Sequence, residues 1–101
     1  MREFLRGAVR LHILHHAVHG EVHGAWMARE LARHGYRISP GSLYPTLHKM
    51  ESEGLIRSRQ QAVDGRVRRS YVATAKGRRT LESTKRRLRE LAREVLGDET
   101  R

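Results

Sequence analysis

The dipeptide Asp64-Gly65 constrains the fold of this chain more than any other short stretch of its sequence. Asp-Gly favours the positive φ angles of a two-residue turn that joins neighbouring antiparallel strands. Segments rich in β-prone residues flank it on both sides, over about 56–63 and 68–73. We therefore predict a β-hairpin at this position and expect it to form the whole sheet.

Four segments outside the hairpin have the spacing of apolar residues that is typical of helices. They span about 3–18, 24–33, 40–53 and 75–96. The first helix is apolar around much of its circumference, so two of its sides are expected to be buried. The last helix keeps a heptad-like apolar spacing, which favours packing against another helix.

Residues with known capping preferences mark the ends of these helices. Ser39 suits an N-cap and Pro40 suits the first helical position. Pro45 lacks a backbone donor, so the third helix is expected to be irregular in its first turns or to begin near Ser42. Thr74 is expected to cap the last helix.

The sequence carries a strong excess of positive charge. Lys and Arg number 21 against 11 Asp and Glu, which gives a formal net charge of +10. Such an excess favours a polyanionic partner, because each phosphate that a protein neutralises releases condensed counterions. The composition therefore points to nucleic acid as a partner.

Several classes of protein are excluded by what the sequence lacks. There is no cysteine, so disulfides, thiolate catalysis and cysteine-based zinc fingers are ruled out. The chain has no plausible Ser-His-acid arrangement, and 101 residues leave little room for a catalytic cleft, so we predict that it is not an enzyme. No apolar run approaches the length of a membrane span, and the start has no secretory pattern. We expect a cytoplasmic protein with no membrane partner.

The order of the elements predicts a winged helix-turn-helix, a mainly α fold with a two-stranded β wing. In this fold the second helix of the pair enters the major groove of DNA. Its outward face is small and polar at Ser42 and Thr46, with one cation at Lys49. The hairpin adds three arginines suited to phosphates or to a minor groove, namely Arg66, Arg68 and Arg69.

Two other interpretations were weighed against sequence-specific DNA binding. An arginine-rich hairpin is often a solvated edge that discourages edge-to-edge pairing. A basic chain can also coat nucleic acid without sequence preference, but such proteins interleave aromatic with basic residues for base stacking. This chain has one Trp, three Tyr and one Phe, mostly at structural positions, so the order of its elements favours sequence-specific recognition.

Residues 35–51, GYRISPGSLYPTLHKME, resemble the signature of the PadR family of transcriptional regulators. His23-Gly24, Gly54-Leu55 and the run from Asp64-Gly65-Arg66 to Tyr71 extend the resemblance over nearly the whole chain. It is similar to the short branch of the family, which has a single C-terminal helix. The resemblance implies a homodimer whose C-terminal helix packs on the partner's first helix. It also implies repression through an inverted-repeat operator, relieved by a ligand.

The resemblance also extends the expected DNA contacts to Tyr44 and Pro45. The full predicted DNA-binding set is Ser39, Ser42, Tyr44, Pro45, Thr46, Lys49, Arg66, Arg68 and Arg69. The sequence departs from the family pattern after His23-Gly24, where Ala25 and Trp26 replace the usual Tyr and its acidic or small neighbour. Trp26 is then expected either to pack near the sugar-phosphate chain or to fill the groove that the missing Tyr leaves.

We assign residues 1–74 to a DNA-binding domain and residues 75–101 to a C-terminal dimerisation helix with a short tail. A chain of this length has a thin core, so an apolar helix stripe gains from burial against a second copy. The predicted dimer contacts are apolar residues of the first and last helices: Phe4, Leu5, Ala8, Leu81, Leu88, Leu91 and Val95.

Four histidines of the first helix, His12, His15, His16 and His19, share one face by their spacing. Pairs four residues apart, above all His12 with His16, can chelate one divalent ion, and zinc suits imidazole and carboxylate ligands. Candidate further ligands are Glu21, His23, Glu90 and Glu94. The alternative is that these are half-buried histidines that bond to backbone and water or respond to pH. No cofactor is expected to be required, and zinc is considered as an effector.

Overall fold

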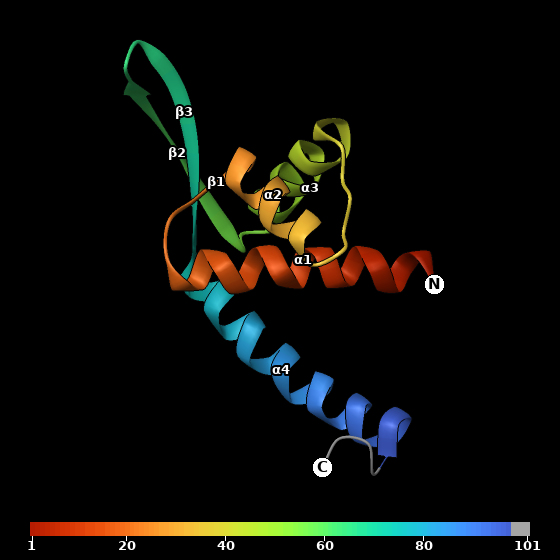
Figure 1. The fold of residues 1–101 in the computed structure, drawn as a ribbon. Coiled ribbons are helices and arrows are strands. Elements are labelled where there is room, and N and C mark those ends of the chain that lie inside the picture. Colours follow the sequence, from red (N-terminus) through yellow and green to blue (C-terminus); the bar gives the residue numbers. More distant parts are fainter. Residues whose placement is uncertain (98–101) are drawn as a thin grey trace.

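The computed structural model describes residues 1–97, and residues 98–101 of the predicted tail lie outside the described part. Its elements are α1 (Arg2–His19), β1 (Val22–His23), α2 (Gly24–Arg33), α3 (Pro40–Ser52), β2 (Ile56–Val63), β3 (Arg66–Ala73) and α4 (Ala75–Leu96). Figure 1 shows α1 running across the middle of the molecule, with α2 and α3 on one side and α4 leaving on the other. The hairpin of β2 and β3 stands at the end of α1 that is remote from the N-terminus. The fold is the expected mainly helical one with a β wing.

The sheet has three strands rather than the predicted two. β1 pairs with β3 in the antiparallel order β1-β3-β2, with Val22 opposite Tyr71. A strand of two residues is too short to show a periodic pattern, so its partner is set by tertiary structure. The pairing fixes the segment between α1 and α2 against the base of the wing.

The hairpin has the turn that Asp64-Gly65 predicts. Asp64 has a φ of 51° and Gly65 a φ of 73°, as a type I′ turn requires. Val63 pairs with Arg66 directly across this turn, so β3 begins two residues earlier than expected. A two-residue turn leaves no freedom of register, and the side chains of the wing are therefore placed in a defined alternation.

The helices follow the predicted bounds closely. α2 has the bounds predicted for it, α4 ends at Leu96, α1 is one residue longer at each end, and α3 ends at Ser52. Pro45 lies inside α3 without interrupting it, so the expected irregularity is absent from the assigned helix. Thr74 caps α4 as predicted, because its Oγ1 accepts a hydrogen bond from the backbone N–H of Gly77 at 3.0 Å.

Ser39 occupies the expected N-cap position of α3 but does not cap it through its side chain. Its carbonyl accepts the backbone N–H groups of Ser42 and Leu43 at 2.9 and 2.8 Å. The Ser39 hydroxyl instead donates to the hydroxyl of Ser42 at 3.4 Å. The start of α3 is therefore held by backbone bonds and by Pro40 at the first helical position.

One hydrophobic core joins all four helices to the base of the sheet. Leu43, Leu47 and Met50 form the buried face of α3, because their spacing places them on one side of the helix. Leu81 of α4 is 2% exposed and belongs to this same core. Its predicted role in the dimer is therefore corrected, because its side chain is already covered by its own protomer.

The first turn of α4 lies unusually close to the backbone of Leu55, the residue before β2. A Cβ at Gly77 would stand 2.1 Å from the carbonyl oxygen of Leu55. Only glycine allows this approach, since backbone atoms cannot move aside as a side chain can. The direction in which α4 leaves the protein is thus set by Thr74, Gly77 and Leu81.

Large apolar side chains are exposed along two helices. Phe4 and Leu5 of α1 are 56% and 52% exposed, and Leu88, Leu91 and Val95 of α4 are 46%, 49% and 68% exposed. Together these five residues form what we call the open apolar surface. A separate property of residues 1–97 is that none of their helices is both long and apolar enough to cross a membrane.

Candidate nucleic-acid interface

α3 turns one face to the core and the opposite face to solvent. The buried face is apolar, whereas the exposed face carries Gly41, Ser42, Pro45, His48 and Lys49. These side chains are small or polar, so the helix can come close to a polar surface without burying bulk. This exposed face is what the sequence predicted for a DNA-reading helix.

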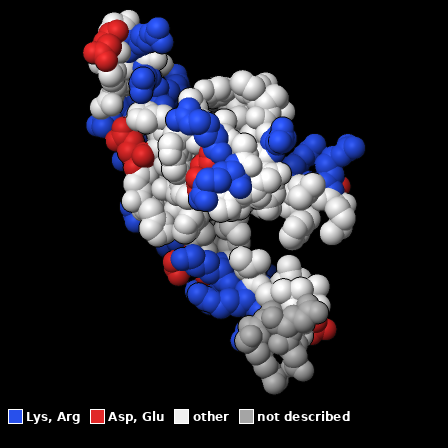
Figure 2. Space-filling view, viewed as in Figure 1, with Lys and Arg blue, Asp and Glu red and all other residues white. Residues whose placement is uncertain are grey.

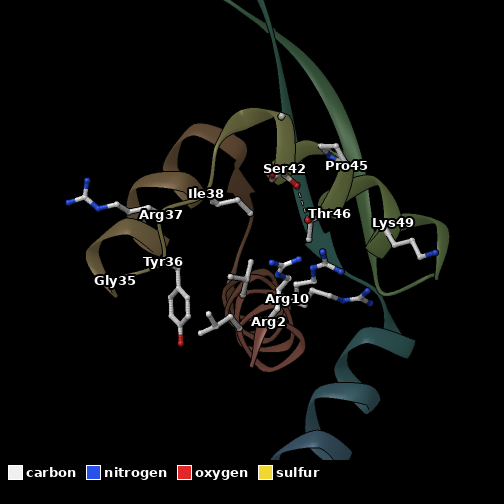
Figure 3. Close-up of a pocket in the computed structure, with 14 residues that line it drawn as sticks. Arg2, Arg10, Gly35, Tyr36, Arg37, Ile38, Ser42, Pro45, Thr46 and Lys49 are labelled. Carbon is white, nitrogen blue, oxygen red and sulfur yellow. Dashed lines mark hydrogen bonds between the residues drawn. The ribbon is translucent and has the colours of Figure 1, made fainter.

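The hydroxyl groups of α3 are held by local bonds. Thr46 Oγ1 donates to the carbonyl oxygen of Ser42 at 2.8 Å, and Thr46 is half-buried. Figure 3 shows this bond and the position of Lys49 one turn further along the helix. The bond fixes the rotamer of Thr46, and it leaves the oxygen of that hydroxyl as an acceptor.

Tyr44 is positioned by a glycine on α2. A Cβ at Gly24 would lie 2.8 Å from both Cε1 and the hydroxyl oxygen of Tyr44, so the ring lies directly against the Gly24 backbone. Tyr44 is 40% exposed and lines a cleft with Trp26 of α2 and with Arg68 and Arg69 of the wing. The structure thus brings Tyr44 and two of the predicted wing arginines together.

The wing is exposed along most of its length and is basic. Arg66, Arg68 and Arg69 are all exposed, and Figure 2 shows basic side chains along the hairpin. Arg69 donates to the hydroxyl of Ser58 across the hairpin at 3.4 Å. Arg59 pairs with Glu21 at 3.2 Å near the base of the wing. The predicted wing arginines therefore stand on a fully paired hairpin, with Arg66 at the tip apart from the other two.

A second basic region, which sequence reasoning missed, lies between α1 and α3. We call it the α1–α3 groove; it has a volume of about 790 Å³ and is open to solvent. Figure 3 shows it between the N-terminal half of α1 and the exposed face of α3. The described residues that line it are Arg2, Leu5, Arg6, Val9, Arg10, Gly35, Tyr36, Arg37, Ile38, Gly41, Ser42, Pro45, Thr46 and Lys49. The spacing of Arg2, Arg6 and Arg10 is the signal that was available in the sequence.

The predicted histidine face divides where α2 meets α1. His16 Nε2 lies 3.4 Å from Glu30 Oε2, and the His12 ring stacks on His34 with centroids 5.0 Å apart. Arg33 donates to both carboxylate oxygens of Glu30 at 2.9 Å. Hydrogen bonds from Arg33 and then from His34 lower the pKa of Glu30 to about 2. This side of the stripe therefore packs against α2 of its own protomer.

The other two histidines of the stripe contact each other. The rings of His15 and His19 have centroids 4.5 Å apart, and His19 Nδ1 lies 2.8 Å from the carbonyl oxygen of His15. Within residues 1–97 no group of three or more His, Asp or Glu side chains is arranged to hold a metal ion. The described protomer therefore does not bring Glu94 into a ligand set with His12 and His16, and a zinc site stays a prediction.

Burial is the main cause that lowers the pKa of three histidines, His12, His15 and His16. Neighbouring imidazoles are the second cause, with His34 beside His12 and His19 beside His15. Removing a protonated imidazole from water, or placing it beside another cation, disfavours the protonated form and so lowers the pKa. The folded chain therefore prefers these three side chains neutral.

Trp26, where the sequence departs from the family pattern, packs against α1. Its ring meets the ring of His16 edge to face, with centroids 5.2 Å apart and planes at 84°. The side chain is nevertheless 39% exposed and lines the cleft that faces Tyr44. Trp26 thus fills space beside α1 and also borders the cleft toward the wing, and both expectations for its role stay predictions.

Comparison with known proteins gives the same picture as the geometry. A model of the transcriptional regulator PadR-like family matches residues 13–83. The transcriptional regulator Rv3488 of Mycobacterium tuberculosis is 64% identical over 100 residues, which cover 99% of this chain and 94% of that protein. Identity at this level over nearly the full length of both chains indicates shared architecture throughout, including α4.

Solved structures of similar fold include other regulators of this kind. A PadR-like transcriptional regulator from Bacillus cereus is 33% identical, with a TM-score of 0.82 over 92% of each chain. A PadR family regulator from Eggerthella lenta is 28% identical, with a TM-score of 0.81 over 92% of this chain and 82% of that one. The overall fold of this chain is thus similar to that of solved PadR regulators from two bacteria.

Proposed function

The chain belongs to the PadR-like family of transcriptional regulators, and from this premise we propose that it is a homodimeric repressor that binds an inverted-repeat operator. The family is one of regulators that bind DNA, not of enzymes. In our proposal α3 of each protomer enters a major groove, the wing holds the flanking backbone, and an effector releases the DNA.

The observation that carries the proposal is the exposed face of α3 between two basic regions. An α-helix with its side chains is about 10–12 Å across, close to the roughly 12 Å width of the major groove. Ser42 can donate to or accept from base edges, Thr46 can accept because its proton is already bonded to the Ser42 carbonyl, and Gly41 adds no bulk at the point of approach. Lys49 at the edge of this face suits a phosphate oxygen.

The dimer is supported by the open apolar surface. Its five residues are each 46% exposed or more, and they lie on the two helices that form the side away from the wing. Burial of apolar area stabilises by about 25 cal/mol per Å², so this surface favours a second copy of the chain. In our proposal α4 of one protomer covers Phe4 and Leu5 of the other.

The proposed effector is a divalent cation such as zinc. Its support is that His12 and His16 lie four residues apart on α1, with ring centroids 6.5 Å apart. Burial lowers the pKa of both side chains, and the neutral imidazole is the form that binds a metal ion. Titration calorimetry with zinc chloride tests the proposal: His16→Ala should reduce the heat of binding, and equal heats for wild type and variant would end it.

Selection of bound duplexes from a random DNA pool tests the proposed DNA recognition. Wild-type protein should enrich an inverted repeat whose half-sites lie about one helical turn, or roughly 10 bp, apart. Ser42→Ala should shift the preferred bases within each half-site, since Ser42 is expected to face the major groove of the DNA. Arg79→Gln, on the outer side of α4, should leave the preferred bases unchanged. Recovery of no common motif would overturn the proposal.

A further inference from the structure

The buried face of α1 becomes basic toward its N-terminus. Ile13, Leu14 and Ala17 lie in the core. Toward the N-terminus the same face continues, at intervals of four residues, with Arg10, Arg6 and Arg2. Figure 1 shows that this N-terminal half of α1 extends away from the wing, past α2 and α3. The C-terminal part of this face is therefore apolar and packs in the core, whereas its N-terminal part carries arginines that line the α1–α3 groove.

The positive charge in this groove is not balanced by acidic side chains. Arg2, Arg6, Arg37 and Lys49 line it, and none of the described residues that line it is Asp or Glu. Arg10 pairs with Glu53 just beyond the end of α3, so its charge is neutralised. Arg2 and Arg6 make no ion pair within residues 1–97 and are exposed. Several positive charges that line one groove without an acidic side chain among them favour the binding of an anionic ligand.

The groove is continuous with the face of α3 that is offered to DNA. Ser42, Thr46 and Lys49 belong both to its lining and to that face, as Figure 3 shows. A helix that lies in a major groove is flanked by two phosphate backbones. The wing stands at one end of α1 and the N-terminus at the other, with α3 between them (Figure 1), and Arg2 and Arg6 lie in the first two turns of α1. The wing therefore accounts for one backbone, and the arginines face the side of the other.

We propose that Arg2 and Arg6, with Lys49 across the groove, form a phosphate clamp for the operator strand on the side of α3 remote from the wing. This inference rests on the proposed DNA-binding function and adds a binding site on α1. Arg10, tied to Glu53, positions α1 against α3 and so sets the width of the clamp. Phosphate contacts of this kind fix the register of α3 without reading bases.

The test compares the salt dependence of DNA binding for wild type, Arg2→Gln/Arg6→Gln and a matched control, Arg79→Gln/Arg86→Gln. The control removes the same two charges from the exposed outer side of α4. The probe is a fluorescent duplex that the wild-type protein selects from a random pool, and binding is followed by anisotropy over a range of salt. Each lost phosphate contact should lower the log–log salt slope by about 0.9. Loss of two contacts in each of two protomers corresponds to a decrease of up to about 3.6.

A conservative variant and a map of the contacted phosphates complete the experiment. Arg2→Lys/Arg6→Lys keeps both charges and should retain most of the wild-type slope. Phosphate ethylation interference should lose its signal on the strand remote from the wing with Arg2→Gln/Arg6→Gln, while the selected motif stays the same. The proposed clamp would be overturned by an unchanged salt slope for Arg2→Gln/Arg6→Gln, or by an equal decrease for the control Arg79→Gln/Arg86→Gln. Wild-type protein that selects no duplex would instead overturn the proposed function itself.

Discussion

α3 and α4 each expose one side to solvent, and the two exposed sides differ in kind. Leu43, Leu47 and Met50 of α3 lie in the core, and its outer side carries Ser42, Lys49 and Tyr44, which is 40% exposed. α4 is buried only at its start, through Leu81, whereas Leu88 and Val95 are 46% and 68% exposed. Within residues 1–97, α3 thus buries its leucines, whereas α4 leaves most of its own exposed.

The exposed sides of the two helices suit different partners. A polar face with a cation gains from an anionic surface rich in hydrogen-bonding groups, as in the grooves of DNA. An exposed apolar stripe gains from removal from water, which a second copy of the same surface supplies. We therefore expect changes in α4 to act through assembly and changes in α3 to act through DNA contacts.

The largest effect is expected from Leu88→Asp. A carboxylate in the open apolar surface would oppose its burial, so the protein should become monomeric while the core residues of the protomer stay in place. Loss of two-site binding should weaken operator affinity by about 100-fold or more. Sedimentation equilibrium and anisotropy measure the two effects. Arg86→Asp, on the opposite side of the same helix, should remain dimeric; a monomeric control or a dimeric Leu88→Asp protein would contradict the comparison.

The next largest effect separates the buried start of α4 from its exposed end. Gly77→Ala places a Cβ against the Leu55 carbonyl and should lower the free energy of unfolding by about 1–3 kcal/mol. Gly41→Ala, on the exposed side of α3, meets only the Ser39 hydroxyl at 3.7 Å and should change that free energy by less than about 1 kcal/mol. Urea denaturation compares the two variants. Equal stability would show that the first turn of α4 can move.

Lys49→Ala is expected to have a smaller effect that is confined to DNA binding. The free energy of unfolding should stay close to that of wild type, since Lys49 is exposed and has no ion pair within residues 1–97. Affinity should fall about equally for all sequences, and the log–log salt slope should decrease by about 0.9 per protomer. Anisotropy against two duplexes of different sequence checks this, and a slope like that of wild type would place α3 in another orientation.

The smallest effect is expected from pH and tests the environment of the histidines of α1. The lowered pKa values of His12, His15 and His16 mean that the unfolded chain binds more protons just below the ordinary value of 6.5. The free energy of unfolding should therefore be greatest above pH 6.5 and decrease as the pH falls through the lowered values. Thermal denaturation at pH 7.5 and 5.5 should show a Tm lower by a few degrees at pH 5.5. A Tm that rises on acidification would contradict the burial of these rings.

Local chemistry in the sequence was enough to predict most of the fold. Asp64-Gly65 defines its hairpin because a two-residue turn leaves one register. Thr74 marks the start of α4 because its side chain caps the helix without help from distant residues. β1 was missed because its two residues acquire strand geometry only by pairing with Tyr71 and Ser70, which are remote in the sequence.

The candidate site was predicted in part, because the sequence shows which residues share a helix side but not which other helix that side contacts. Helical spacing placed Ser42 and Lys49 on one exposed side of α3, because Leu43 and Leu47 had to lie on the other. Helical spacing also sets Arg2 and Arg6 on one side of α1, a signal that the sequence analysis did not use, and spacing alone does not tell which neighbour they face. Nor could it show that α2 would divide the histidine stripe, since those contacts depend on how whole helices pack.

Dimeric binding to an inverted repeat is tested most directly by the stoichiometry of the complex on a selected duplex, measured by sedimentation equilibrium at saturating protein. We expect two protomers per duplex, bound to half-sites about one helical turn apart. A saturated complex that contains a single protomer on one half-site would contradict it.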